Sequence, residues 1–250
     1  MKHLFLLVTI LLAKISFSQD VDVLLKQANN FDKQVKEAEA IEKYKEVLAI
    51  APNNFKALYR LTELNAAIGS RQVKDKDKVP FFQSAYDYAQ QAYKSDSTNA
   101  DAFYLLSLTS WKKSLVEEKN KEEVEFLRNW KEYAEKAITI NPKHAKATFL
   151  LGKWNLDLSK ASILKKAAAK TIYGGISKWD IETAIKFFEQ AKTFDQYFVQ
   201  NYYELVKAYE YNNQPTQQIE TLNRLVKLPV RTGDDAGWKA EGKKMLEQMK

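Results

Sequence analysis

Apolar residues recur three and four positions apart along most of the chain, which is the spacing of one face of an α-helix. The same run of small and large apolar residues returns in five segments. Two of them align at identical spacing, with Ala40, Tyr44 and Pro52 in one and Trp130, Ala134 and Pro142 in the other. Ala85 marks a third segment, and Ala184 with Phe188 marks a fourth. The chain is therefore built from a repeated helical unit.

A second helical pattern precedes each of these segments. Residues 55–67, 100–111, 145–157 and 199–211 align without gaps, and residues 21–31 match more loosely. In most copies of this pattern, one position holds a small residue. In the stretch "FLLGKW" the residue at that position is Gly152. Glycine inside a helix costs about 1 kcal/mol relative to alanine. We therefore expect Gly152 to make room for the partner helix near Ala184 and Phe188.

A helix pair that ends at a proline resembles the tetratricopeptide repeat, whose usual length is about 34 residues. The resemblance implies an all-α fold, an α-solenoid of about five helix hairpins closed by a C-terminal capping helix. The low content of glycine and proline, 7 and 5 residues, also argues against an all-β fold. The expected repeats are residues 21–54, 55–99, 100–144, 145–198 and 199–232, with the capping helix at 234–249.

The three middle repeats are longer than the other two. Residues 69–82 combine glycine, proline and charged residues, and we expect them to form an exposed loop. Residues 112–126 predict a lengthened helix pair with a charged tip. In the fourth repeat, helix-forming residues continue to about Thr171, before the break at Gly174 and Gly175.

The start of the chain has the pattern of a secretory signal peptide. Lys2 is followed by an unbroken apolar run from Leu4 to Ala13, and small residues lead up to Ser18. The run is too short to cross about 30 Å of hydrocarbon as a helix. We expect cleavage after Ser18, a single domain over residues 19–250 without a membrane span, and a periplasmic or extracellular location. An uncleaved anchor is the alternative.

The charge and composition of the chain argue against several classes of function. The formal net charge is +7, and it falls to +5 when residues 1–18, with two lysines and no acid, are removed. Lys and Glu alternate without a clustered basic stripe, so we expect no nucleic-acid partner. The chain has no cysteine, and His144, beside Pro142, has the position of a turn residue or helix cap. No constellation of side chains predicts catalysis, a metal or a cofactor.

The second half of the chain, roughly residues 130–250, resembles the helical-repeat domain of the regulator of microtubule dynamics family. The shared features are "LLG" in a helix, an overlong segment ending in "YGG", an Ala…Phe-Phe…Ala helix, and an "LP…T…D" loop before the last helix. We expect a bacterial-type, secreted member. The resemblance implies a domain that binds partners, and in the family's mitochondrial tethering member such a domain also binds and transfers phospholipid.

In this architecture the first helices of the hairpins line a concave groove, and helical spacing selects the side chains that face it. The candidate groove residues are Tyr59, Tyr104, Leu108, Trp111, Phe149, Lys153, Tyr203 and Lys207. Tetratricopeptide domains that clamp a terminal carboxylate have lysine where four of these repeats have an aromatic residue. We therefore expect no clamp of that kind.

Three roles fit the candidate groove residues. They could hold an extended apolar peptide, or an acyl chain with an anionic headgroup near Lys153 and Lys207, because ligand pockets are mostly apolar with a few placed polar groups. They could also simply fill space between repeats. The leading hypothesis is a non-enzymatic scaffold of the cell envelope that binds a protein or extended peptide. The alternative is a module that binds or transfers phospholipid or another apolar ligand through the same groove.

Overall fold

The computed structural model describes residues 20–117, 120–161 and 179–249, and the regular elements in these ranges are helices. A helix over residues 20–33 comes first. It is followed by α2 (Glu37–Ile50), α3 (Phe55–Arg71), α4 (Asp75–Ser95), α5 (Ala100–Ser114), α6 (Asn120–Ile140), α7 (Ala145–Lys160), α9 (Ile181–Phe194), α10 (Val199–Tyr211), α11 (Pro215–Leu225) and α12 (Asp235–Gln248). The predicted all-α class is confirmed.

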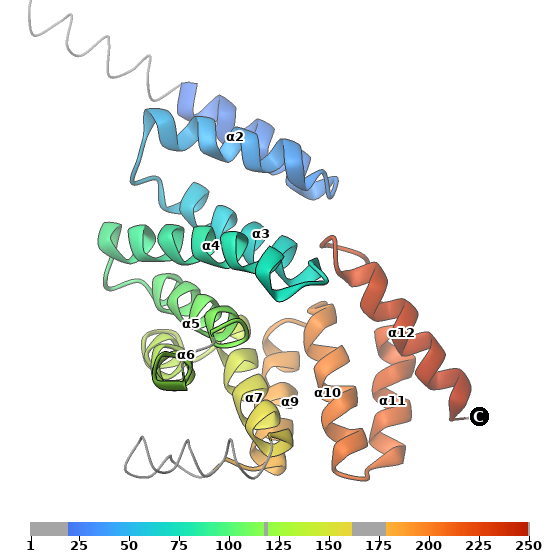
Figure 1. The fold of residues 1–250 in the computed structure, drawn as a ribbon. Coiled ribbons are helices and arrows are strands. Elements are labelled where there is room, and N and C mark those ends of the chain that lie inside the picture. The colour runs from blue at the N-terminus through green and yellow to red at the C-terminus, as the bar shows by residue number, and fades with distance from the viewer. Residues whose placement is uncertain (1–19, 118–119, 162–178, 250) are drawn as a thin grey trace, which may run out of the picture.

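Consecutive helices pair into hairpins that stack along a curve (Figure 1). The hairpins are α3 with α4, α5 with α6, α7 with α9 and α10 with α11. Each contacts the next, because α4 packs on α5, α6 on α7 and α9 on α10. The last helix, α12, lies against α10 and α11. This arrangement is the predicted solenoid with a helix covering its C-terminal end, as terminal elements of solenoids do.

The first helices of the hairpins begin where the aligned pattern begins, and polar side chains cap three of them. Asn54 accepts a hydrogen bond from the backbone N–H of Ala57, at 3.1 Å, at the start of α3. Asn99 does the same for α5, where it accepts from the backbone N–H of Asp101. At the start of α7 the cap is His144, whose Nδ1 accepts from Ala147 at 3.1 Å. These side chains satisfy N–H groups that the first helical turn leaves without partners.

Gly152 lies where α7 crosses α9. A Cβ atom built on it would lie 2.7 Å from the ring of Phe188, a side chain that is fully buried. This is the contact that the alignment predicts, and Ala184 is buried on the same helix. The close approach explains why the helix tolerates the conformational cost of glycine at this position.

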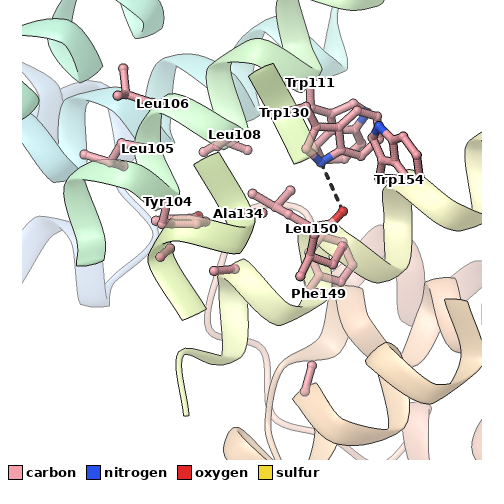
Figure 2. Close-up of a cluster of buried hydrophobic side chains, with 14 of the residues drawn as sticks. Tyr104, Leu105, Leu106, Leu108, Trp111, Trp130, Ala134, Phe149, Leu150 and Trp154 are labelled. Atoms are coloured by element: carbon pink, nitrogen blue, oxygen red, sulfur yellow. Dashed lines mark hydrogen bonds between the residues drawn. The ribbon is translucent and has the colours of Figure 1, made fainter. Parts of the chain in front are cut away.

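The main core cluster extends from α3 to α10, and an aromatic group at its centre lies between α5, α6 and α7 (Figure 2). Trp111 and Trp130 stack with ring centroids 5.5 Å apart. The indole N–H of Trp130 donates to the carbonyl of Leu150 at 3.0 Å, and that of Trp154 donates to the carbonyl of Leu127 at 2.9 Å. The indoles of Trp130 and Trp154 thus satisfy their single donors while their rings fill the space between helices.

The prediction of a loop over residues 69–82 is wrong. Helix α3 continues to Arg71 and α4 begins at Asp75, so only a short connection interrupts the helices. A Cβ on Gly69 would lie 2.6 Å from the ring of Phe82, which shows that the hairpin remains closely packed up to its tip. The charged residues misled the prediction because they occupy the exposed side of the first turns of α4.

Of the lengthened pair predicted over residues 112–126, only the second helix is confirmed. Helix α6 begins at Asn120 and has 21 residues, whereas α5 ends at Ser114 after 15 residues, fewer than α3 or α7 have. The predicted extension to Thr171 and the predicted signal peptide lie outside the described residues. Among the helices that are described, none has the length and apolar character needed to cross a membrane.

The two ends of the stack meet. Arg71, at the end of α3, donates to Glu37 at the start of α2 and to Asp234 just before α12, the latter at 3.0 Å. Arg71 and Asp234 are 163 residues apart in sequence. A second ion pair joins Arg231 to Asp195, after α9, at 3.3 Å. We call the contact of Glu37, Arg71 and Asp234 the end-to-end ion cluster.

Candidate functional site

One face of the first helices carries two groups of polar side chains, and together we call them the inner face. It is formed by Tyr59, Glu63, Tyr104, Lys146, Lys153, Glu204 and Lys207. Lys146 on α7 reaches past α5 to Glu63 on α3, with Nζ 2.6 Å from Oε1. Because side chains from non-adjacent hairpins touch here, the inner face is the concave side of the stack.

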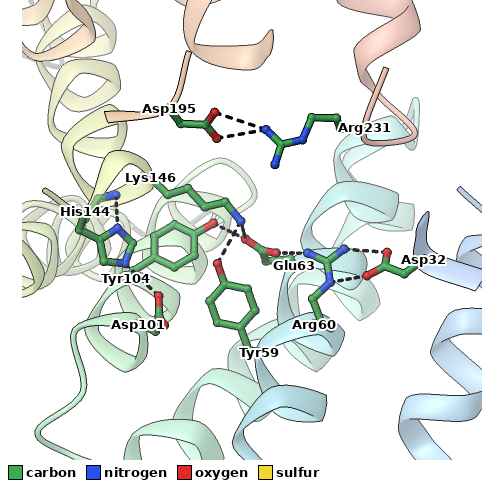
Figure 3. Close-up of polar contacts among 11 residues, drawn as sticks. Asp32, Tyr59, Arg60, Glu63, Asp101, Tyr104, His144, Lys146, Asp195 and Arg231 are labelled. Atoms are coloured by element: carbon green, nitrogen blue, oxygen red, sulfur yellow. Dashed lines mark hydrogen bonds and ion pairs between the residues drawn. The ribbon is translucent and has the colours of Figure 1, made fainter. Parts of the chain in front are cut away.

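The N-terminal half of the inner face is an ion-pair network centred on Glu63 (Figure 3). Arg60 binds both oxygens of Asp32, at 2.7 and 2.8 Å, and also contacts Glu63. Glu63 accepts from Lys146 and from the hydroxyl of Tyr104, the latter at 2.7 Å. The network thereby connects the helix over residues 20–33 with α3, α5 and α7.

The charge state of Glu63 follows from its partners. Burial opposes its ionisation, but the cations of Lys146 and Arg60 outweigh burial and lower its pKa to about 2. Burial and the neighbouring Glu63 carboxylate raise the pKa values of Tyr59 and Tyr104 well above their ordinary value. At neutral pH Glu63 is therefore a carboxylate between the two cations of Lys146 and Arg60, beside two neutral tyrosine hydroxyls.

The C-terminal half of the inner face is a second network, between α7 and α10. Lys153 lies 2.5 Å from Asp157 and 3.4 Å from Glu204, and Lys207 lies 3.3 Å from the same Glu204 oxygen. Burial favours neutral Glu204, but Lys153 and Lys207 outweigh it and lower its pKa. The two lysines predicted to share one end of the groove are thus joined through one carboxylate.

The apolar candidates from the sequence lie mostly between helices. Phe149 is 2% exposed, and its ring packs against Phe188 and Phe198 with centroids 5.7 and 5.0 Å away. Leu108 and Trp111 are also buried, and Trp111 makes an edge contact with Phe149. These three side chains fill space between repeats, which is one of the roles that the sequence left open.

The tyrosines among the candidates make polar contacts as well as packing contacts. The ring centroid of Tyr59 lies 5.9 Å from that of Tyr104, and its hydroxyl accepts from Lys146 at 3.0 Å. Tyr203 stacks on Trp238 of α12, and its hydroxyl donates to Glu241. The structure thus brings Tyr59 and Tyr104 together, and it places Tyr203 against the capping helix.

Several inner-face residues were not predicted from the sequence. Lys146 and Glu204 look like ordinary surface charges of amphipathic helices, and only the packing of the hairpins brings Lys146 to Glu63 and Glu204 to Lys153. Next to the inner face, the sequence offers a signal at Lys112, which follows a stretch of apolar residues and small hydroxyl residues in α5. A lysine so placed is buried here, at 7% exposure.

His144 caps α7 and also ties this helix to the preceding hairpin. Its Nε2 lies 3.1 Å from the carboxylate of Asp101 on α5, and its ring centroid lies 5.2 Å from that of Tyr104. Within the described ranges no group of three histidine, aspartate or glutamate side chains could hold a metal ion.

The family model described as Regulator of microtubule dynamics protein 1-3 matches residues 19–250. No curated protein matches the sequence significantly.

Solved structures with similar folds are tetratricopeptide-like proteins. The thermophilic protein TTC0263 of Thermus thermophilus is 12% identical, with 91% of this chain and 99% of that chain covered and a TM-score of 0.64. PilF of Pseudomonas aeruginosa is 11% identical, with 94% and 93% covered and a TM-score of 0.54. At these identities the likeness establishes a tetratricopeptide-like fold and nothing further.

Proposed function

Because the chain belongs to the regulator of microtubule dynamics protein 1-3 family over residues 19–250, we propose that it is a non-enzymatic scaffold that binds an extended segment of a partner protein. The binding surface is the inner face, where α3, α5, α7 and α10 each contribute side chains. Neither a metal nor a cofactor takes part in this role.

The observation that carries the proposal is the polar character of this concave surface. Glu63, Lys146, Lys153, Glu204 and Lys207 are fixed in place by ion pairs along successive hairpins. An extended peptide presents alternating N–H and C=O groups and charged side chains. These groups can form hydrogen bonds and ion pairs with the polar side chains along the inner face. A ligand that binds to side chains already held in place also loses less conformational entropy in the complex than one that must order mobile side chains.

The same observation weighs against the lipid alternative. A site for an acyl chain needs an apolar lining with few polar groups. Leu108, Trp111 and Phe149, the apolar candidates for that lining, are occupied by contacts with neighbouring helices. We therefore favour the peptide over the phospholipid.

A charge reversal on the inner face tests the proposal with a closely matched control. Lys207 pairs with Glu204 three residues earlier, and Lys192 on α9 pairs with Glu189 in the same spacing; both lysine side chains are 31% exposed. Peptides are first selected from a random library against the mature protein. Lys207→Glu is expected to weaken their binding about tenfold or more, because a charge that contacts the ligand is reversed.

The variant Lys192→Glu is expected to change the affinity by less than about twofold, since α9 contributes nothing to the inner face. Equal affinities for both variants would contradict the proposed surface. Native mass spectrometry of the purified protein completes the test. Co-purified phospholipid that the selected peptides displace would establish the lipid alternative instead.

We also propose that the chain is exported and acts in the periplasm or outside the cell, on the basis of the apolar run near its start. N-terminal sequencing of the protein recovered from the cell envelope or medium is expected to begin at Gln19. A mature protein that begins at Met1 would contradict the cleavage.

A further inference from the structure

The last turn of α5 holds a buried lysine without a counter-charge. Lys112 is 7% exposed, and its Nζ lies 3.5 Å from the ring centroid of Trp111. Among the described residues no carboxylate lies within ion-pairing distance of this ammonium. Lysines are almost never buried in this way unless they are paired, because removing a charge from water is costly.

The surroundings of Lys112 increase the excess of positive charge. The Nζ of Lys153 lies 5.5 Å from the same Trp111 ring, so both ammonium groups lie against one indole. Lys160 and Lys207 add two positive charges to this cluster, and the carboxylates of Asp157 and Glu204 add two negative charges. These four lysines and two carboxylates leave the cluster with a formal charge of +2. Asp234 also attracts Lys112 electrostatically, but its carboxylate is already paired with Arg71.

A neutral donor at the same place also lacks a partner. The indole N–H of Trp111 is buried and makes no hydrogen bond to any residue that the structure describes. The neighbouring buried indoles of Trp130 and Trp154 both donate to backbone carbonyls. Buried donors are rarely left unsatisfied in native structures, and each such exception calls for an explanation.

We propose that Lys112, Lys153 and the indole N–H of Trp111 form a binding site for one oxyanion group, a carboxylate or a phosphate, carried by the ligand of the inner face. Such a group supplies the missing negative charge and accepts the unused hydrogen bonds. Charge-assisted hydrogen bonds of this kind are stronger than neutral ones. Asp157 and Glu204 do not exclude the anion, since they already bind Lys153 and Lys207.

The protonation of Lys112 agrees with this assignment. Burial, and then the charge of Lys153, lower its pKa to about 7. An anion placed beside the ammonium would raise that pKa and hold Lys112 in its charged form. The site is thus set to take up a proton when the anion binds.

The test uses inorganic phosphate and acetate as probes, with sodium chloride at equal ionic strength as the reference. The mature protein is titrated by isothermal calorimetry and by ¹H–¹⁵N spectra of its five indole groups. Saturable binding is expected, with a downfield shift of one indole signal that is absent from Trp111→Phe. A response to acetate identifies a carboxylate site, and a response to phosphate alone identifies a phosphoryl site.

Two neighbouring lysines provide the variant and its control. Lys112→Met removes the buried charge at similar side-chain length and is expected to weaken anion binding about tenfold or more. Lys113→Met alters a lysine that instead bonds Gln83 at 3.0 Å, and it is expected to bind like the parent protein. Equal binding by both variants, or a response no larger than that to sodium chloride, would overturn the assignment.

The proposal rests on ligand binding at the inner face, but the two can fail separately. Selected peptides that bind without regard to Lys112, together with no saturable anion binding, would overturn the oxyanion site alone. Saturable anion binding that depends on Lys112, in a protein that selects no peptide, would support the site and contradict the peptide scaffold.

Discussion

Glu63 is the residue on which the N-terminal polar network depends. Its carboxylate is the shared acceptor for Arg60, Lys146 and Tyr104, and its side chain is only 12% exposed. When one member of a buried ionic network is removed, its partners lose their counter-charge inside the protein. Such a loss costs more than the net contribution of the intact pair.

We expect Glu63→Gln to lower the free energy of unfolding at pH 7 by about 2–4 kcal/mol. The folded-state pKa of Glu63, about 2, lies below its ordinary value of 4.5, so its stabilisation is complete above about pH 4.5 and is lost as the pH falls towards 2. Urea unfolding at pH 7 and pH 3 measures both effects, and the difference between variant and parent should shrink at pH 3.

The control for this prediction is Glu135→Gln, which alters an exposed carboxylate paired with Lys131 at 2.8 Å. A surface pair of this kind contributes about 0–1 kcal/mol. A loss of similar size in the two variants would show that the Glu63 network does not stabilise the fold.

Lys112 has the opposite effect on stability. Its folded-state pKa of about 7 lies below its ordinary value of 10.5, so the buried charge costs stability fully below pH 7, and the cost shrinks as the pH rises towards 10.5. We therefore expect Lys112→Met to unfold at higher urea concentration than the parent protein at pH 6. The gain should be smaller at pH 9.5, and an equal gain at both values would contradict the depressed pKa.

At the scale of helices, the crossing of α7 and α9 sets a size limit at Gly152. In Gly152→Ala the new methyl group would lie 2.7 Å from the Phe188 ring, which is enclosed and cannot withdraw freely. The expected loss is about 1–3 kcal/mol of unfolding free energy, even though alanine favours the helix by about 1 kcal/mol. Thermal or urea unfolding measures the sum of the two.

Gly237→Ala is the matched control, because Gly237 also lies in a helix, α12, and a Cβ there meets nothing within 4 Å. It is expected to leave stability unchanged or to raise it by up to about 1 kcal/mol. If both substitutions stabilise the protein, the crossing of α7 and α9 has enough space for a methyl group at Gly152, and the size limit proposed there is wrong.

The helices were largely predictable from the sequence, and the inner-face contacts were not. The starts of α3, α5, α7 and α10 follow from short-range periodicity, and the close crossing at Gly152 follows from aligning the repeats. The ion pair between Lys146 and Glu63 depends instead on how strongly successive hairpins curve. That curvature is a sum of small rotations at each interface, and no single residue pattern reports it.

At the scale of the whole molecule, the end-to-end ion cluster joins the first and last parts of the stack. Arg71 is partly exposed, so the two pairs that it makes contribute little to global stability. Their role is local, because they hold the start of α12 against the ends of the first hairpins.

We expect Arg71→Met to change the unfolding free energy by less than about 1 kcal/mol and to accelerate amide hydrogen exchange around residues 231–235. The local contact would open without global unfolding. Arg128→Met, which alters a pair within α6, is the control and should leave exchange in that loop unchanged. Unaltered exchange in Arg71→Met would show that other contacts hold the two ends together.

The end-to-end ion cluster also restricts how this protein can change its length. An open solenoid can gain or lose a repeat, because each repeat contacts only its neighbours. Here an inserted or deleted hairpin would rotate and shift Asp234 away from Arg71 and break a contact between residues 163 positions apart. The joined ends thus make the number of hairpins part of the geometry of the fold, as the number of strands is in a closed barrel.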